Sequence, residues 1–201
     1  KIPQRLDFWD TEKLTGSQLA EYHAREFYMD IYATSKTYGR PELEHSHVDL
    51  IEGGKTTIQE KVCGFRGSSS MKVGFQKRCG PKKVRPYDDD DFDVLVVHWL
   101  ARRTKKGYDF GVITKKKGGG HVYVHDDSIK YLGHWRIPMT TLRERYIVNT
   151  EDGPGQVSFR VRPPLDVCDR FNFPMRYADS KSSTNLPKKS HKDWTSGIQR
   201  S

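Results

Sequence analysis

The stretch that decides the fold is VDLIEGGKTTIQEKVC, residues 48–63. Two short runs, residues 48–51 and 56–63, read as strands, and the EGGK segment between them is typical of a β-hairpin turn. Alternation along the second strand places Gln59 and Lys61 on one face. The hairpin brings Asp49 alongside them. A carboxylate, an amide oxygen and an amine are therefore expected together at one end of a small sheet.

The length of the turn decides whether these side chains meet. A two-residue glycine turn would pair Asp49 with Ile58 and direct the carboxylate away from Gln59. A three-residue turn that pairs Glu52 with Thr56, or a β-bulge, would bring the two side chains to the same face. The sequence leaves both open, and the site requires the second.

These groups suit phosphodiester hydrolysis, in which a divalent cation polarises the phosphate and lowers the pKa of the attacking water. Carboxylate, carbonyl and water ligands favour Mg²⁺, with Mn²⁺ as the alternative. The expected ligands are Asp49, the Gln59 side chain and the Glu60 backbone carbonyl. Lys61 is expected to orient the water and offset negative charge. The other interpretation of Lys61 is an edge lysine that guards against aggregation.

Asp49, followed after ten residues by Gln59-x-Lys61 across a hairpin, resembles the PD-(D/E)xK nuclease superfamily in the variant where Gln replaces an acidic residue. The likeness spans about residues 14–165. Residues 16–21 look like the family's first helix, residues 87–97 like the strand after the lysine, and residues 135–142 like a closing strand and helix.

The resemblance implies an α/β fold that is restriction-endonuclease-like, with a mixed central sheet flanked by helices and additional C-terminal strands. It also implies that Glu21 is a catalytic residue and metal ligand, where a helix glutamate is otherwise a solvated charge. Val48 stands where many members have Pro, and Glu60 where they have an apolar residue. Glu60 is expected to face away from Gln59 and to need a partner, because an unpaired buried carboxylate is costly.

The net charge of the 201-residue chain is +9, and a basic surface attracts polyanions. Residues 64–86 concentrate this charge, with seven basic residues and no acidic one. We expect them to contact DNA phosphates, although the segment also fits a merely disordered stretch. The expected contacts are Arg66, Lys72, Lys77, Arg78, Lys82, Lys83 and Arg85.

The sequence thus predicts a divalent-metal-dependent endonuclease that hydrolyses phosphodiester bonds in DNA, most simply double-stranded DNA. The alternatives are a non-catalytic nucleic-acid-binding module of the same fold and an RNA-cleaving nuclease. Cutting both strands with one such site implies a homodimer. No run approaches the roughly 18 apolar residues of a membrane span. Cys63, Cys79 and Cys168 predict reduced thiols in an intracellular protein, the alternative being one bridge between the first two.

The expected organisation is an N-terminal extension (1–13), a nuclease-like domain (14–172) and a polar C-terminal tail (173–201) that Trp194 anchors. The chain starts with Lys, which suggests a piece of a longer one. A helix capped by Thr15 or Ser17 should end near residues 38–41. Strands are expected at 71–75, 93–100, 108–114, 121–125, 134–138 and 156–162, and helical turns at 139–146.

Several other residues admit two interpretations. The acidic run 88–91 is a solvated loop or a metal site, and Lys115-Lys116-Lys117 with three glycines is a hairpin tip that reaches a nucleic-acid backbone or a mobile loop. His45 and His47 flank Asp49 as alternative ligands or bases. His98 and Trp135 are expected to be structural.

Overall fold

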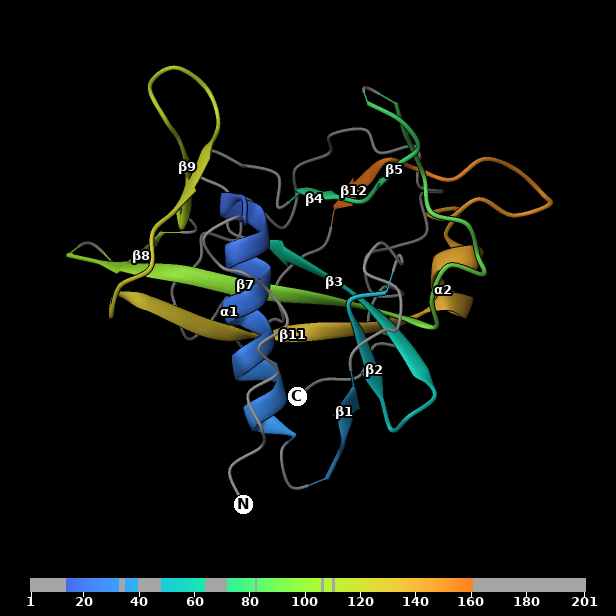
Figure 1. The fold of residues 1–201 in the computed structure, drawn as a ribbon, viewed down its shortest axis with the longest axis horizontal. Coiled ribbons are helices and arrows are strands. Elements are labelled where there is room, and N and C mark those ends of the chain that lie inside the picture. The colour runs from blue at the N-terminus through green and yellow to red at the C-terminus, as the bar shows by residue number, and fades with distance from the viewer. Residues whose placement is uncertain are drawn as a thin grey trace.

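The computed structural model describes residues 14–32, 35–39, 48–63, 72–81, 83–105, 107–109 and 111–160. Within them, the fold is mixed α/β around one central sheet (Figure 1). The strand order is β1 (Tyr38–Gly39), β2 (Leu50–Glu52), β3 (Thr56–Cys63), β7 (Val94–Thr104) and β11 (Ile129–Pro138), with β8 (Gly107–Asp109) also paired to β7. The β3–β7 pair is parallel and the other pairs of this sheet are antiparallel.

Strand β7 is the centre of the sheet and is buried on both faces, as its apolar sequence predicts. Alternate residues of a strand face opposite sides. Val96 and Leu100 pack in clusters with helix α1, whereas Val97 and Trp99 pack with the opposite layer. The sequence predicts this strand correctly but stops it at residue 100, four residues before its end at Thr104.

Helix α1 (Gly16–Ile31) covers one face. Thr15 caps it through a capping box with Gln18, which confirms one of the two expected caps. Ala20, Ala24 and Tyr28 are fully buried against the sheet, whereas Phe27 and Ile31 on the same helix are 43% and 48% exposed. The helix also ends well before the expected stop at residues 38–41, where Tyr38 and Gly39 instead pair with β2.

Among the described residues, the opposite face is covered mainly by strands and loops. Strands β4 (Lys72–Gly74) and β12 (Ser158–Arg160) pair there, and α2 (Met139–Glu144) packs at one end. The helical turns expected at 139–146 are present as α2, which ends two residues earlier, at Glu144. The core of this layer is aromatic and contains Phe75, Tyr87, Phe92, Trp99, Trp135 and Phe159.

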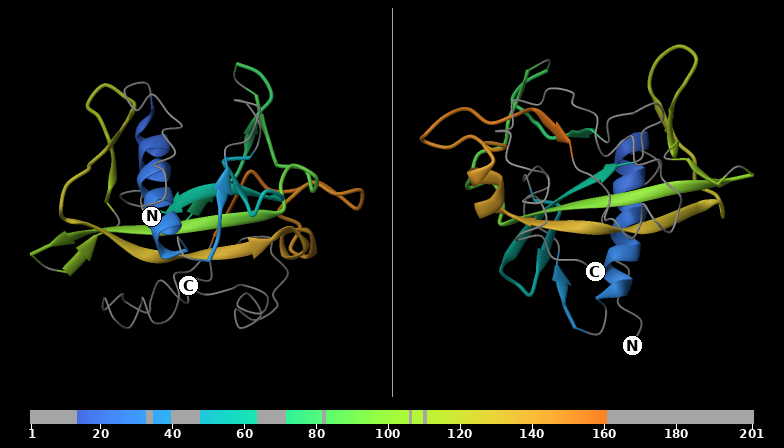
Figure 2. Two further views of the ribbon diagram at one scale, coloured as in Figure 1. Left: turned by 60° about the horizontal axis from the view of Figure 1, so that its bottom comes forward. Right: turned by 180° about the vertical axis from the view of Figure 1, so that it is seen from behind.

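Two small hairpins complete the described fold. One is β5 (Lys77–Arg78) with β6 (Val84–Arg85), and the other is β9 (Ile113–Lys115) with β10 (His121–Tyr123). Beyond Ile58, β3 pairs only with β7 among the described residues and so forms an edge of the sheet, called here the β3 edge. In all views both hairpins extend past this edge (Figures 1 and 2). The expected strand 108–114 is wrong as a single element, because its first residues pair with β7 and its last residues with β10. The expected strand 134–138 is the second half of β11.

Gly16 lets the β9–β10 hairpin pack directly on α1. A Cβ atom at this position would lie 2.9 Å from both the His121 carbonyl oxygen and the Tyr123 backbone nitrogen. Because backbone atoms cannot rotate away, Gly16→Ala is expected to lower the free energy of unfolding by about 1–3 kcal/mol, the usual range for overpacking. Chemical denaturation measures this, with Gly74→Ala as control, since a Cβ at Gly74 meets nothing within 4 Å. Equal effects of the two substitutions would disprove the contact.

Cys63 is buried and Cys79 is exposed, and both are free thiols, so the alternative bridge between them is not formed. In the part of the chain that is described, no helix has both the length and the apolar character to cross a membrane. The expected N-terminal extension, the C-terminal tail with Trp194, and the residues His45, His47 and Cys168 lie outside the described residues.

Candidate metal centre and active site

The turn between β2 and β3 has the length that the site requires. Gly53 and Gly54 take positive φ values of 62° and 73°, and Glu52 pairs with Thr56 across a three-residue turn. Such backbone angles are readily adopted by glycine. The pairing shifts by one residue just before Leu50, because the Asp49 backbone nitrogen donates to the Ile58 carbonyl at 2.7 Å, and the Asp49 side chain still accepts from Gln59 Nε2. The condition set by the sequence is therefore met, and Asp49 lies beside Gln59.

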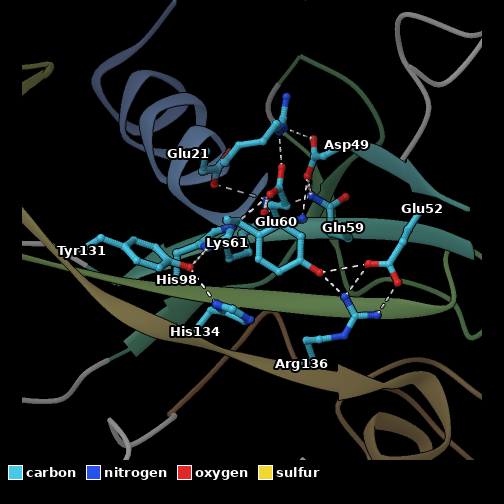
Figure 3. A network of polar contacts seen from close by, with 12 residues as sticks. Glu21, Asp49, Glu52, Gln59, Glu60, Lys61, His98, Tyr131, His134 and Arg136 are labelled. Atoms are coloured by element: carbon cyan, nitrogen blue, oxygen red, sulfur yellow. Dashed lines mark hydrogen bonds and ion pairs between the residues drawn. The ribbon is translucent and has the colours of Figure 1, made fainter. Parts of the chain in front are cut away.

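Asp49 directly precedes β2, at the point where β3 continues past its pairing with that strand. Its Oδ2 accepts hydrogen bonds from the Glu60 backbone nitrogen at 2.7 Å and from Gln59 Nε2. Gln59 Nε2 also donates to the Glu60 carbonyl oxygen at 3.2 Å. Beyond Ile58, the described part of β3 pairs with β7 alone, so these groups occupy a sheet edge (Figure 3).

Lys61 and Glu21 complete the set around the same edge. Lys61 Nζ donates to the Glu60 carbonyl oxygen at 2.6 Å and lies 3.4 Å from Glu21 Oε1 on α1. The side chains of Lys61 and Glu21 are only 17% and 20% exposed. The structure thus brings together Glu21, Asp49, Gln59, the Glu60 carbonyl and Lys61, all of which the sequence predicts.

Burial and charge shift the pKa values of Glu21 and Lys61 at this edge. Burial raises the pKa of Glu21 to about 7, with the Lys61 ammonium opposing this shift and the Asp49 carboxylate adding to it. Burial alone would lower the pKa of Lys61, but Glu21 and Asp49 hold it above its ordinary value. Lys61 is therefore a fixed cation, and Glu21 is a carboxyl group that a nearby positive charge would ionise.

The Glu60 side chain finds the partner that its burial demands. It is fully buried and faces α1, where Arg25 donates to Oε2 through Nε, while His98 Nε2 is 2.9 Å from Oε1. Burial would raise the pKa of Glu60, but Arg25 and His98 hold it at about 2. Arg25 Nη2 also lies 4.0 Å from Asp49 Oδ1. Only the backbone carbonyl of Glu60 is thus left to serve the candidate site.

Arg25 was not predicted from the sequence. It lies next to buried Ala24 on α1. A cation at a buried position of a helix needs a buried acidic partner, so the position of Arg25 is the sequence feature that could have indicated its pairing. His98, expected to be structural, is fully buried and bonded to Glu60, which supports that interpretation.

A hydrogen-bonded chain continues from His98 across the sheet. His98 Nδ1 is 3.0 Å from the Tyr131 hydroxyl, which is 2.8 Å from His134 Nδ1 (Figure 3). His134 Nε2 is in turn 3.2 Å from the Tyr32 hydroxyl. These contacts tie β3, β7, β11 and the end of α1 together. Through His98, this hydrogen-bonded chain holds the Glu60 carboxylate, and so the β3 edge, on the face of the sheet that α1 covers.

A second buried pair holds the other end of the β2–β3 hairpin. Arg136 contacts both carboxylate oxygens of Glu52, at 2.8 and 3.0 Å, and Lys36 Nζ donates to the same carboxylate at 3.0 Å. Burial would raise the pKa of Glu52, but these donors lower it. Because Glu52 is the last residue of β2, the pair helps to fix the turn that places Asp49.

His134 makes stability depend on pH. Burial, with His98 and Arg136 nearby, lowers the pKa of His134 to about 3. The unfolded chain binds a proton near pH 6.5 and the folded chain does not, so stability is full above pH 6.5 and falls as the pH drops toward 3.

His134→Gln is expected to remove up to about 1.4 kcal/mol per pH unit from the slope of unfolding free energy between pH 6.5 and 5. This window lies above the ordinary pKa range of carboxylates. Urea denaturation at several pH values measures it, with His121→Gln as control, because His121 is exposed. An unchanged slope in His134→Gln would contradict the assignment.

The acidic run 88–91 is engaged by a lysine. Asp88, Asp90 and Asp91 come close enough to hold a cation, but Lys77 Nζ already lies 2.6 Å from Asp88 and 2.6 Å from Asp91. Lys77 is only 5% exposed. It is therefore not presented to a phosphate, which corrects its place among the expected DNA contacts.

The remaining basic residues of the expected DNA contacts divide into two groups. Arg78, Lys83 and Arg85 are exposed on the β5–β6 hairpin, with Arg85 3.1 Å from Asp88. Arg66 and Lys82 lie outside the described residues, and for Lys72 only the backbone in β4 is described.

No family model and no curated protein match this chain. A solved structure described as the crystal structure of MepB is similar with a TM-score of 0.43 and 14% identity, over 88% of this chain and 95% of that chain. A likeness at this level carries no conclusion about activity. The geometry at the β3 edge is therefore the basis for a proposed function.

Proposed function

We propose that this chain is a divalent-metal-dependent endonuclease acting on DNA, with a restriction-endonuclease-like fold. The observation that carries the proposal is the three-residue turn, which places Asp49 beside Gln59 and next to Lys61. Support for the fold comes from one helix over a mixed sheet, a hairpin, and a parallel strand following the lysine. Glu21 joins the same edge from α1.

The donor set fits a hard cation. Asp49 and Glu21 offer carboxylate oxygens, Glu60 offers a carbonyl oxygen, and half a turn of the Gln59 amide would exchange its nitrogen for an oxygen beside Asp49. Oxygen ligands of this kind suit Mg²⁺ or Mn²⁺. When bound, the cation supplies Lewis-acid polarisation of the phosphate and a more acidic water.

The chain's own residues would position and stabilise the reacting groups. Lys61, held cationic by Glu21 and Asp49, would orient the attacking water and offset the charge that develops on the phosphate. Arg25 and His98 keep the Glu60 backbone in place by fixing its side chain. Arg78, Lys83 and Arg85 are exposed and would contact the DNA backbone.

A non-catalytic DNA-binding module of the same fold is the second candidate. Gln59 replaces an acidic ligand, and the Glu60 carboxylate is used by Arg25 and His98, so only Asp49 and Glu21 contribute anionic ligands. Two carboxylates suffice for Mg²⁺, which is bound in many sites by one or two of them together with waters. We therefore favour catalysis.

A metal titration on a panel of substrates separates these functions. Supercoiled plasmid, linear duplex DNA, single-stranded DNA and RNA of matched sequence are incubated with the protein and increasing Mg²⁺ or Mn²⁺, with EDTA as control. We expect duplex DNA to be cleaved in proportion to bound metal. Binding of DNA without cleavage at any metal concentration supports the module, and cleavage of RNA alone supports a ribonuclease.

A further inference from the structure

The β9–β10 hairpin is a further segment with basic residues and no acid. Residues 111–125 contain Lys115, Lys116 and Lys117, all exposed, and neither Asp nor Glu. The tip consists of Gly118, Gly119 and Gly120, with φ values of 100°, 97° and 78°. A Cβ atom at any of these glycines would meet nothing within 4 Å, so the tip lies in open space.

The base of this hairpin is docked firmly on α1. The backbone of His121 and Tyr123 lies against Gly16, and Ile113 and Tyr123 belong to the buried cluster that contains Ala20 and Ala24. The rings of His23 on α1 and His125 after β10 stack with centroids 3.9 Å apart. These contacts fix the base of the hairpin on α1, and the exposed residues 115–120 project from it.

The arm and the candidate site share one helix. The docking residues Gly16 and His23 lie on either side of Glu21 along α1. The arm extends beyond the β3 edge, where Glu21 and Lys61 lie, and the basic β5–β6 hairpin extends in the same direction from the other side (Figures 1 and 2).

We propose that the β9–β10 hairpin is a DNA-binding arm that enters the major groove of duplex DNA, with its lysines on the phosphates. The major groove, about 12 Å wide, admits a two-stranded ribbon, whereas the minor groove is about 6 Å wide. The glycine tip carries no side chains and can approach the base edges. The long lysine side chains beside it reach the backbone on the groove walls. This inference rests on the proposed function for its choice of DNA.

The test compares two matched double variants. Lys115→Gln/Lys117→Gln removes two charges from the arm, and Lys55→Gln/Lys130→Gln removes two exposed charges from the β2–β3 turn and from β11. Binding to a duplex of about three helical turns is measured by fluorescence anisotropy in EDTA over a range of salt concentrations. EDTA prevents metal-dependent cleavage, so the readout is binding alone, and the comparison of the two variants isolates the contribution of the arm.

The arm variant is expected to bind roughly tenfold more weakly. The slope of log affinity against log salt is expected to fall by about 2, since each neutralised phosphate contributes about 0.9. The control is expected to retain the wild-type slope. A slope in the arm variant equal to that of wild type overturns the proposal.

Double-stranded RNA of the same sequence tests the groove. Its major groove is deep and narrow, so the arm cannot enter, and wild type is expected to prefer DNA while the arm variant loses that preference. Equal binding of both duplexes by wild type overturns groove entry.

Failure of the arm also remains distinct from failure of the nuclease. Arm-dependent binding without metal-dependent cleavage refutes only the nuclease, and cleavage with arm-independent binding refutes only the arm.

Discussion

Lys61→Ala is expected to reduce metal-dependent DNA cleavage by about 10²–10³-fold while duplex binding changes little. Its ammonium lies 2.6 Å from the Glu60 carbonyl oxygen and 3.4 Å from Glu21 Oε1, so it is the cation positioned at the candidate metal centre. Loss of one preorganised group that stabilises developing charge typically costs this much in rate. Binding should persist because the exposed basic residues of the hairpins are unaffected.

The rate is measured as the initial rate of plasmid nicking, and binding as anisotropy in EDTA. Lys55→Ala is the control, because Lys55 is exposed in the turn of the same hairpin and lies outside the site. Lys61→Arg keeps the charge but not the geometry of the ammonium, so an intermediate rate is expected. Cleavage by Lys61→Ala at the wild-type rate would remove Lys61 from the mechanism.

Arg25→Met is expected to destabilise the fold by about 3–5 kcal/mol, because it leaves the fully buried Glu60 without its guanidinium partner. For a chain of this size, that corresponds to a fall in melting temperature of roughly 6–20 °C. Most of the expected loss is the cost of leaving the Glu60 carboxylate buried without a cation, and it exceeds the net contribution of the Arg25–Glu60 ion pair to stability. The double variant Arg25→Met/Glu60→Gln is therefore expected to recover part of the loss.

Urea denaturation of the two variants and of Arg143→Met measures these differences. Arg143 pairs with Asp89 at 3.2 Å, but its side chain is 57% exposed, and exposed pairs contribute at most about 1 kcal/mol. If Arg25→Met were no more destabilising than Arg143→Met, the Arg25–Glu60 contact would not support the site as described.

The hairpin and the central strand could be predicted because local patterns dictate them. Glycines at positions 53 and 54 mark a turn, and the apolar run of β7 marks a strand buried on both sides. The turn length could not be predicted, since both registers satisfy the same local preferences. It depends on the tertiary contacts of Glu52 with Arg136, which is 84 residues away in the chain.

Partners of buried charges were harder to predict. The need of Glu60 for a partner follows from its place in a strand, but Arg25 is 35 residues away and resembles a solvated helix residue. The basic neighbours of Lys77 predict a DNA contact, whereas its ammonium binds Asp88 and Asp91 of the acidic run. The first half of β11 was missed because Lys130 and Gly133 obscure its alternation, and the register shifts there.

We propose that Asp49 organises a metal-dependent active site at the β3 edge. Asp49→Asn preserves the shape of the side chain and an oxygen that can accept from the Glu60 backbone nitrogen, but removes the charge that would hold a cation. The control is Asp30→Asn, at an exposed position on α1.

The measurement is nicking of supercoiled plasmid by wild type, Asp49→Asn and Asp30→Asn in Mg²⁺, with EDTA in parallel. We expect wild type and Asp30→Asn to nick the plasmid only in Mg²⁺, and Asp49→Asn to be at least about 10²-fold slower. Nicking by Asp49→Asn at the wild-type rate, or nicking that persists in EDTA, would contradict the assignment of this edge as the active site.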